Sequence, residues 1–145
     1  MTKPLAVITG ASSGIGEATA KAFSNAGYPI LLLARRLEIM ESFNLKNSIC
    51  KKVDVRDRDA VVTAIREAEK QYGPTDMLFN NAGVARLADI STQDPSEWDE
   101  MIDVNTKGVM NGIFAVMSDM KARKSGTIVN MSSIAGRKVY EDHTV

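Results

Sequence analysis

The sequence predicts an α/β fold in which a doubly wound parallel sheet forms one domain over residues 1–145. Short β-branched runs alternate with longer segments of helical period, which is the pattern of a parallel sheet with helices on both faces. A chain of 145 residues is long enough to bury one core. Right-handed crossovers between the strands then favour a sheet with the first strand near its centre.

Each element has its own local signal. Strands are predicted where apolar and β-branched residues run together, at Leu5–Thr9, Pro29–Ala34, Ile49–Val53, Met77–Asn80 and Thr127–Met131. Helices are predicted between them, at Gly14–Ala26, Leu37–Phe43 and Asp57–Tyr72. Gly27 and Gly73 follow the first and third helices, so a glycine in the left-handed conformation is expected to end each of them.

A fourth helix has the clearest start signal. Asp94 is expected as its N-cap, with Pro95 at the first helical position and Glu97 at the third, which approximates a capping box. Asn105 interrupts an apolar stripe of helical spacing, and a buried amide without partners costs roughly 1–3 kcal/mol, so Asn105 becomes a candidate site residue. The apolar members of that stripe are Trp98, Ile102, Val109, Ile113, Val116 and Met120.

The composition argues against several classes of function. Lysine plus arginine equals aspartate plus glutamate at 18 each, so the overall charge favours neither nucleic acid nor an anionic membrane as a partner. No apolar run approaches the roughly 18 residues of a membrane-spanning helix, and no signal segment precedes the first predicted strand. Cys50 is the only cysteine and cannot form an internal disulfide. We expect a cytoplasmic protein with no nucleic-acid partner, no membrane partner and no metal site.

A glycine-rich turn follows the first predicted strand and opens the first helix. Gly10 would allow the tight turn, Gly14 would let the backbone approach a pyrophosphate, and Gly16 would let helix and sheet pack closely. The N-terminus of the helix would then attract the phosphates. A merely structural turn is the alternative for this segment taken alone. The other contacts expected from the turn are Ser12, Ser13 and Ile15.

The end of the second strand predicts which dinucleotide binds. Proteins that use NAD usually place an acid there, about 20 residues beyond the glycines, to hold the ribose 2′-hydroxyl. Here Ala34 takes that position, and Arg35 and Arg36 follow. Arginine offers several donors in a fixed fork, which suits a 2′-phosphate, so the pair predicts NADP rather than NAD. One of the two could instead be a solvated residue at the start of the next helix, and the sequence does not decide which.

Together these motifs resemble one enzyme family, the short-chain dehydrogenases/reductases. The residues that carry the resemblance are Thr9–Gly16, Asn80–Gly83, Asn105 and Ser132–Ser133. They occur in the order and context of that family, and the resemblance covers essentially all 145 residues. It implies a Rossmann-like, NADP-binding domain.

The resemblance also implies roles for residues that the spacing alone would leave open. Asp54 and Val55 would contact the adenine ring, although an aspartate after a strand is by itself typical of a turn or cap. Asn81, Ala82 and Gly83 would stabilise the central sheet and line the adenosine and ribose side of the cofactor.

Two further residues would take part in the reaction. Ser133 would hydrogen-bond the reacting carbonyl oxygen, while Ser132 would only shape the turn. Asn105 would hold a water in the proton relay, or would tie its helix to a neighbouring carbonyl as a buried amide. In the family a tyrosine follows the second serine by about a dozen residues, with a lysine about one helical turn later, so both are expected just beyond Val145.

Tyr140 and His143 are not expected to replace that pair. Tyr140 follows Ser133 too closely and has no lysine four residues after it, so we interpret it as a substrate-loop or surface residue. His143, the only histidine, lies in a polar stretch and is expected in a solvent-facing loop.

The expected function is that of an NADP(H)-dependent oxidoreductase, which interconverts a carbonyl and an alcohol of a small-molecule substrate by hydride transfer. The chain would be the N-terminal part of a family protein of roughly 250 residues that forms a homo-oligomer, either a dimer or a tetramer. If the 145 residues are the natural product, the alternative is a non-catalytic NADP-binding or regulatory module. A methyltransferase is disfavoured because it would not need the paired arginines or the Asn81–Gly83 element. The identity of the substrate cannot be read from these residues.

Overall fold

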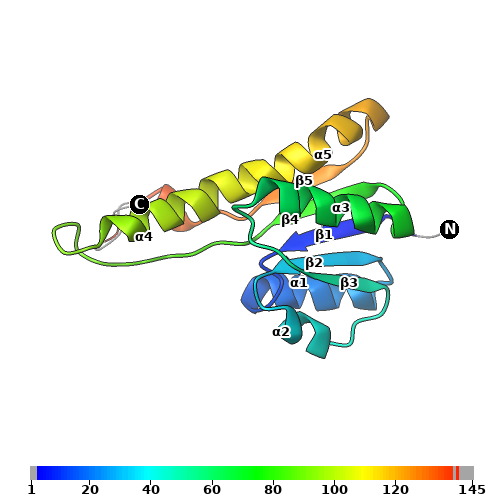
Figure 1. The fold of residues 1–145 in the computed structure, drawn as a ribbon, viewed down its shortest axis with the longest axis horizontal. Coiled ribbons are helices and arrows are strands. Elements are labelled where there is room, and N and C mark those ends of the chain that lie inside the picture. Colours follow the sequence, from blue (N-terminus) through cyan, green and yellow to red (C-terminus); the bar gives the residue numbers. More distant parts are fainter. Residues whose placement is uncertain (1–2, 139, 141–145) are drawn as a thin grey trace.

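A computed structural model of the chain describes residues 3–138 and 140, and His143 lies outside this part. Five parallel strands form one sheet in the order β3-β2-β1-β4-β5 (Figure 1). The strands are β1 (Leu5–Thr9), β2 (Ile30–Ala34), β3 (Ser48–Lys52), β4 (Thr75–Asn80) and β5 (Thr127–Asn130). The predicted doubly wound sheet with the first strand at its centre is therefore confirmed.

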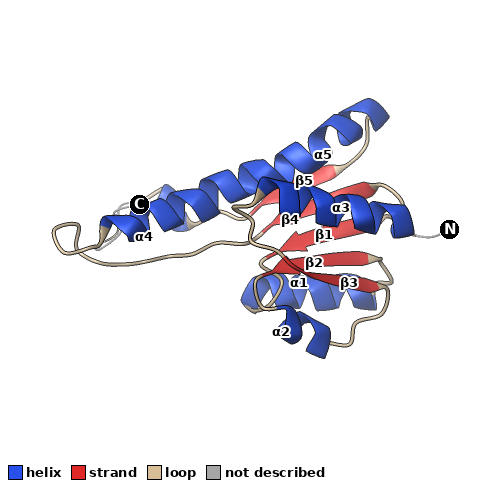
Figure 2. Ribbon diagram, in the orientation of Figure 1, coloured by secondary structure: helices blue, strands red, loops and turns tan. Residues whose placement is uncertain are grey.

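Helices cover both faces of the sheet, and Figure 2 shows the two groups on opposite sides of the strands. The helices are α1 (Gly14–Asn25), α2 (Leu37–Ser42), α3 (Arg58–Tyr72), α4 (Pro95–Ile102) and α5 (Val109–Arg123). The first two pack on one face, whereas α3 and α5 pack on the other. None of the helices within residues 3–138 is both long and apolar enough to span a bilayer.

The central strand β1 shows why this sequence forms a sheet that is buried on both sides. Leu5 and Val7 belong to the core under α3 and α5, whereas Ala6 and Ile8 belong to the core under α1 and α2. All four side chains are at most 1% exposed. A strand between two helical layers reads as a continuous apolar run, because alternate side chains enter different cores.

Most predicted boundaries agree with the structure within one or two residues, but one glycine differs from expectation. Gly27 has a positive φ of 80°. Gly73 also has a positive φ, of 85°, yet its ψ is −177°, so the predicted left-handed conformation is wrong at this position. Pro74 follows directly, and the proline ring pushes the preceding residue toward an extended ψ.

The fourth predicted helix is interrupted by a π-helical segment, η1 (Asp103–Gly108), between α4 and α5. A π-helical turn holds more residues than an α-helical turn. Positions chosen at uniform α-helical spacing therefore no longer lie on the buried face once the helix passes through the π-helical segment. Ile102 is 43% exposed, and Asn105 is exposed too, so the predicted apolar face is wrong at these positions. The residues that are buried instead are Met101, Val104, Gly108, Asn111, Gly112 and Ala115, joined by the predicted Val116 and Met120.

Several of the exposed apolar side chains lie on α5 and at the edge strand β5. Met110, Phe114 and Met117 project from α5, with Phe114 63% exposed. At the edge strand β5, Val129 is 39% and Met131 41% exposed. Val129 and Met131 therefore expose apolar surface at this edge of the sheet.

Candidate functional site

A cleft of about 410 Å³ opens at the carboxyl ends of β1, β2, β3 and β4. In open parallel sheets, ligands bind outside these ends, at the point where the strand order reverses around the first strand. A cleft of this volume lies within the range of small-molecule sites. The residues that line it are Gly10, Ser12, Ser13, Leu33, Ala34, Arg35, Arg36, Val53, Asp54, Val55, Asn81, Ala82, Gly83, Val84 and Val104.

The three glycines of the first turn have different local environments. A Cβ atom on Gly10 would lie 2.7 Å from the Cα atom of Ala82, and one on Gly16 would lie 2.4 Å from the carbonyl oxygen of Gly10. Both glycines are therefore required by packing. Gly14 has a φ of +57° and open space where its Cβ would be, at the N-terminus of α1. Of these, only Gly10 lines the cleft, and Gly14, Ile15 and Gly16 do not.

The end of β1 is tied to the end of β4 by one threonine and one asparagine. The buried Thr9 hydroxyl accepts the backbone N–H groups of Asn81 and Ala82, each at 3.0 Å. The Asn81 side-chain amide donates back to the carbonyl oxygens of Thr9 and Gly10, at 3.1 and 3.3 Å. This exchange fixes the Asn81–Gly83 segment beside the glycine turn, where both line the same cleft.

The two arginines after β2 differ in their contacts. The Arg36 guanidinium donates to the Ser12 hydroxyl at 3.0 and 3.2 Å and to the Ser13 hydroxyl at 2.8 Å. Ser13 is the N-cap of α1 but makes no side-chain capping bond, because its hydroxyl turns to Arg36. Arg35 is 60% exposed in its side chain, and its nearest acid is Glu100 at 3.9 Å. Both arginines line the cleft beside the buried Ala34.

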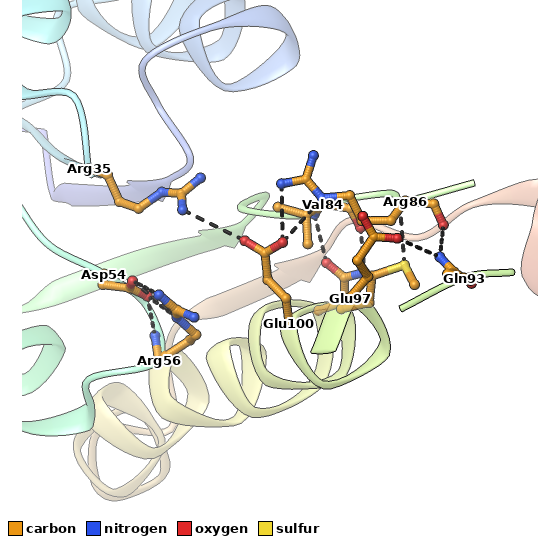
Figure 3. Close-up of polar contacts among 10 residues, drawn as sticks. Arg35, Asp54, Arg56, Val84, Arg86, Gln93, Glu97 and Glu100 are labelled. Carbon is orange, nitrogen blue, oxygen red and sulfur yellow. Dashed lines mark hydrogen bonds and ion pairs between the residues drawn. The ribbon is translucent and has the colours of Figure 1, made fainter. Parts of the chain in front are cut away.

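Asp54 follows β3, and a neighbouring arginine orients its carboxylate (Figure 3). The carboxylate accepts the Arg56 backbone N–H at 3.0 Å and the guanidinium at 2.6 to 3.1 Å. This side-chain hydrogen bond lowers the pKa of Asp54 below its ordinary value and outweighs the effect of partial burial. Asp54 therefore stays ionised as an acceptor for any N–H donor that enters the cleft.

The buried Asn111 on α5 supports the same segment, and the sequence analysis missed it. Its side-chain amide donates to the carbonyl oxygens of Val55 and Arg56, at 2.9 and 3.3 Å. Its own oxygen accepts from Arg58 at 3.0 Å. Asn111 is a polar residue in a helix, but it lies off the predicted apolar stripe, so uniform helical spacing placed it on the solvent-facing side. The change in helical phase at η1 brings it to the buried face.

The loop between β4 and α4 is fastened to the helix that follows it (Figure 3). Asn105 exchanges two hydrogen bonds with the backbone of Val84, at 2.8 and 2.9 Å. Arg86 donates its backbone N–H to the Met101 sulfur at 3.3 Å, and its carbonyl accepts from Gln93 at 2.8 Å. Asn105 does not line the cleft itself, but it holds Val84, which does.

Two of the three predicted start signals of α4 are found, and the third differs from expectation. The Asp94 carboxylate caps the helix by accepting the Ser96 N–H at 2.8 Å, and Pro95 takes the first helical position. The Glu97 carboxylate, however, accepts from the Gln93 amide at 3.3 Å. The approximate capping box of the sequence therefore links Glu97 to the preceding loop.

The serine pair lies after β5, outside the lining of the cleft. The exposed Ser133 hydroxyl accepts the Ala135 N–H at 3.1 Å and so begins the short 3₁₀ turn η2 (Ile134–Gly136). The turn-forming role expected of Ser132 thus falls to Ser133. A hydroxyl that accepts one hydrogen bond can still donate its own hydrogen to a substrate. Tyr140 is half-buried.

Several residues of the site carried no signal in the sequence. Leu33, Val53, Val84 and Val104 line the cleft as apolar neighbours of predicted residues. Cys50 lies in β3, half-buried against the core under α1 and α2, and burial raises the pKa of its thiol.

The residues that line the cleft suit a dinucleotide, which is an anionic ligand. The glycine turn leaves open space at the N-terminus of α1, two arginines after β2 supply donors, and the Ser13 hydroxyl of the turn lies beside them. No acid occupies the end of β2 itself, since Ala34 stands there.

Comparisons with known proteins agree with this geometry. The sequence model of the short chain dehydrogenase family matches residues 4–145. An uncharacterized oxidoreductase of Listeria monocytogenes is 42% identical over 140 residues, which cover 92% of this chain and 56% of that protein. Acetoacetyl-CoA reductase of Paracoccus denitrificans is 40% identical over 136 residues, with shares of 92% and 56%. The closed form of a serine dehydrogenase complexed with NADP⁺ superposes with a TM-score of 0.90 at 30% identity, covering 95% of this chain and 57% of that one.

The chain thus spans little more than half the length of the relatives it matches, and the match extends through the glycine turn, the arginine pair and the serine pair alike. A family model that matches from residue 4 to residue 145, together with a shared fold, decides the classification. The chain belongs to the short-chain dehydrogenase family.

Proposed function

We propose that the protein is an NADP(H)-dependent oxidoreductase that interconverts a carbonyl and an alcohol on a small molecule. One observation carries the choice of cofactor: Arg35 and Arg36 line the cleft after β2, while Ala34 stands where an NAD-binding protein usually has an acid. A similar structure holds NADP⁺, which supports the proposal. A relative that is an acetoacetyl-CoA reductase supports carbonyl chemistry.

We assign each wall of the cleft to one part of the cofactor. The backbone at Gly14 and the N-terminus of α1 would take the pyrophosphate, because free N–H groups and the helix dipole favour anions there. Arg35 and Arg36, with Ser13, would hold the 2′-phosphate. Asp54 and the backbone of Val55 would contact the adenine. The Asn81–Gly83 segment would line the ribose.

The chemistry combines the cofactor with side chains of the protein. When bound, the nicotinamide supplies or accepts the hydride. The Ser133 hydroxyl would donate a hydrogen bond to the reacting carbonyl oxygen, where negative charge develops. Asn105 would support the proton relay through the segment that it orders at Val84. The proton would be exchanged by the tyrosine and lysine that the resemblance to the family implies.

We also propose that the protein forms a homo-oligomer through α5. Met110, Phe114 and Met117 line an apolar hollow on this helix together with Val62 of α3. Contiguous exposed apolar surface of this kind is typical of protein–protein contacts. The resemblance to the family implies an interface through this helix, which is the end of the predicted fourth helix, and through the helix that follows it.

Turnover tests the proposal. We expect the protein expressed from its complete reading frame to reduce carbonyl compounds with NADPH. The reaction is measured as the loss of NADPH absorbance. Ser133→Ala should lower kcat by roughly 10²-fold or more with little change in the Kd of NADP⁺, because the hydroxyl acts on the transition state. Ser132→Ala is the matched control and should keep most of the activity. Unchanged kcat in Ser133→Ala would remove this serine from the mechanism, and cofactor binding without any turnover would contradict the oxidoreductase assignment.

A further inference from the structure

Glu100 of α4 lies between Arg35, which lines the cleft, and Arg86 of the loop after β4 (Figure 3). Its Oε2 atom accepts from Arg86, at 3.1 Å from Nη2 and 3.2 Å from Nε. Its Oε1 atom lies 3.9 Å from Nη1 of Arg35. One carboxylate therefore bridges the loop after β4 and the arginine that follows β2.

The two halves of this bridge are held with different strength. Arg86 is fixed through its backbone, which bonds to Met101 and Gln93, so the pair with Glu100 is short and anchored. Arg35 has the most exposed side chain of the three, at 60%, against 48% for Arg86 and 23% for Glu100. The long contact to Arg35 is the part of the bridge that a ligand can most easily replace.

Arg36 is in a different situation, since the Ser12 and Ser13 hydroxyls hold its guanidinium. A phosphate on the 2′-oxygen carries about two negative charges at neutral pH. If such a group binds beside Arg35, it also comes close to the Glu100 carboxylate, and like charges repel. NAD, which has no such phosphate, would not experience this repulsion.

We propose that Glu100 is a specificity-determining residue, which competes with the 2′-phosphate of NADP for Arg35 and weakens the preference for NADP that the arginine pair creates. This inference rests on the proposed NADP binding. Arg86 moderates the effect, because it neutralises part of the Glu100 charge. Removal of the Glu100 charge should therefore strengthen NADP binding, whereas removal of Arg86 should weaken it.

The test is a titration of the protein with NADP⁺ and NAD⁺ by calorimetry, since these two probes differ only in the 2′-phosphate. Glu100→Gln should bind NADP⁺ about threefold to tenfold more tightly than the wild type and should bind NAD⁺ equally. Arg86→Gln should bind NADP⁺ several-fold more weakly, again with no change for NAD⁺. The gain in Glu100→Gln should shrink at high salt, because these charges are partly exposed.

Glu97→Gln is the matched control, because it makes the same change one turn earlier on α4, where the carboxylate contacts Gln93. It should leave both affinities unchanged. Unchanged or weaker NADP⁺ binding in Glu100→Gln would overturn the inference. If Glu100→Gln does not fold, Arg86→Gln decides, and unchanged NADP⁺ binding in that variant would overturn the inference as well.

A separate variant tests the assumption beneath the inference. Arg35→Ala should weaken NADP⁺ binding and leave NAD⁺ binding as it is. If wild-type protein binds the two probes equally and Arg35→Ala changes neither, the proposed NADP function fails. If Arg35→Ala behaves as expected but Glu100→Gln shows no gain, only the role of Glu100 fails.

Discussion

Asn111→Leu should destabilise the protein by about 2 kcal/mol, because it removes the amide that holds the segment after β3. Asn111 is 4% exposed, and its shortest hydrogen bond, at 2.9 Å, is to the carbonyl oxygen of the buried Val55. Leucine fills a similar volume, so the cost arises mainly from that carbonyl, and a buried acceptor without a partner costs about 1–3 kcal/mol. Arg56 and Arg58 are exposed, so water replaces Asn111 at these two contacts and they add little.

The assay is equilibrium unfolding in urea, with the free energy obtained by linear extrapolation. Asn25→Leu, an exposed asparagine at the end of α1, is the control and should change the free energy of unfolding by no more than about 0.5 kcal/mol. A loss in Asn111→Leu that does not exceed the control would refute the reasoning. Val55 lines the cleft, so the affinity for NADP⁺ should fall in the same variant.

Three other predictions concern the cofactor, the pH dependence and the assembly. Ala34→Asp combined with Arg35→Ser should reverse the preference from NADP⁺ to NAD⁺ in a binding assay, because an acid then meets the 2′-oxygen; a retained preference for NADP⁺ would count against the arginine pair. The pKa of Asp54 is lowered, so its stabilising contribution is complete above the ordinary value of 3.8 and disappears as the pH falls through the lowered pKa. Wild type and Asp54→Asn should therefore differ in unfolding free energy by a constant amount from pH 7 to about pH 5, and a difference that already disappears in that range would be inconsistent with the Arg56 contact. Phe114→Glu should yield a smaller species in analytical ultracentrifugation at unchanged helical content, and an unchanged mass would exclude the exposed face of α5 as the interface.

The sheet could be predicted from the sequence because its signals are local. Leu5–Ile8 is a continuous apolar run, as is typical of a strand that is buried on both faces of a sheet. The turns that follow the strands contain glycine or polar residues. The glycine turn and the arginine pair were found by the same reasoning, since they follow directly after strands, whereas Asp54, Val55 and Asn81–Gly83 were assigned from the resemblance to the family. The carboxyl ends of parallel strands meet at one edge, so position along the chain predicts position in space.

The remaining features depend on distant contacts or on a change in helical period. The π-helical segment at Asp103–Gly108 moved Asn105 off the buried face and brought Asn111 onto it, and no uniform spacing predicts such a change. Arg86 and Glu100 are separated by 14 residues, and only the path of the loop between them brings them together. The ψ of Gly73 could have been predicted, because Pro74 was visible in the sequence.

The ratio of the Kd values for NADH and NADPH in wild-type protein tests the central claim most directly. The measurement is a fluorescence or calorimetric titration at physiological ionic strength, because salt weakens contacts between arginines and phosphate. If Arg35 and Arg36 bind a 2′-phosphate, NADPH should bind at least roughly tenfold more tightly, which corresponds to about 1.4 kcal/mol. Equal affinities, or tighter binding of NADH, would contradict the account.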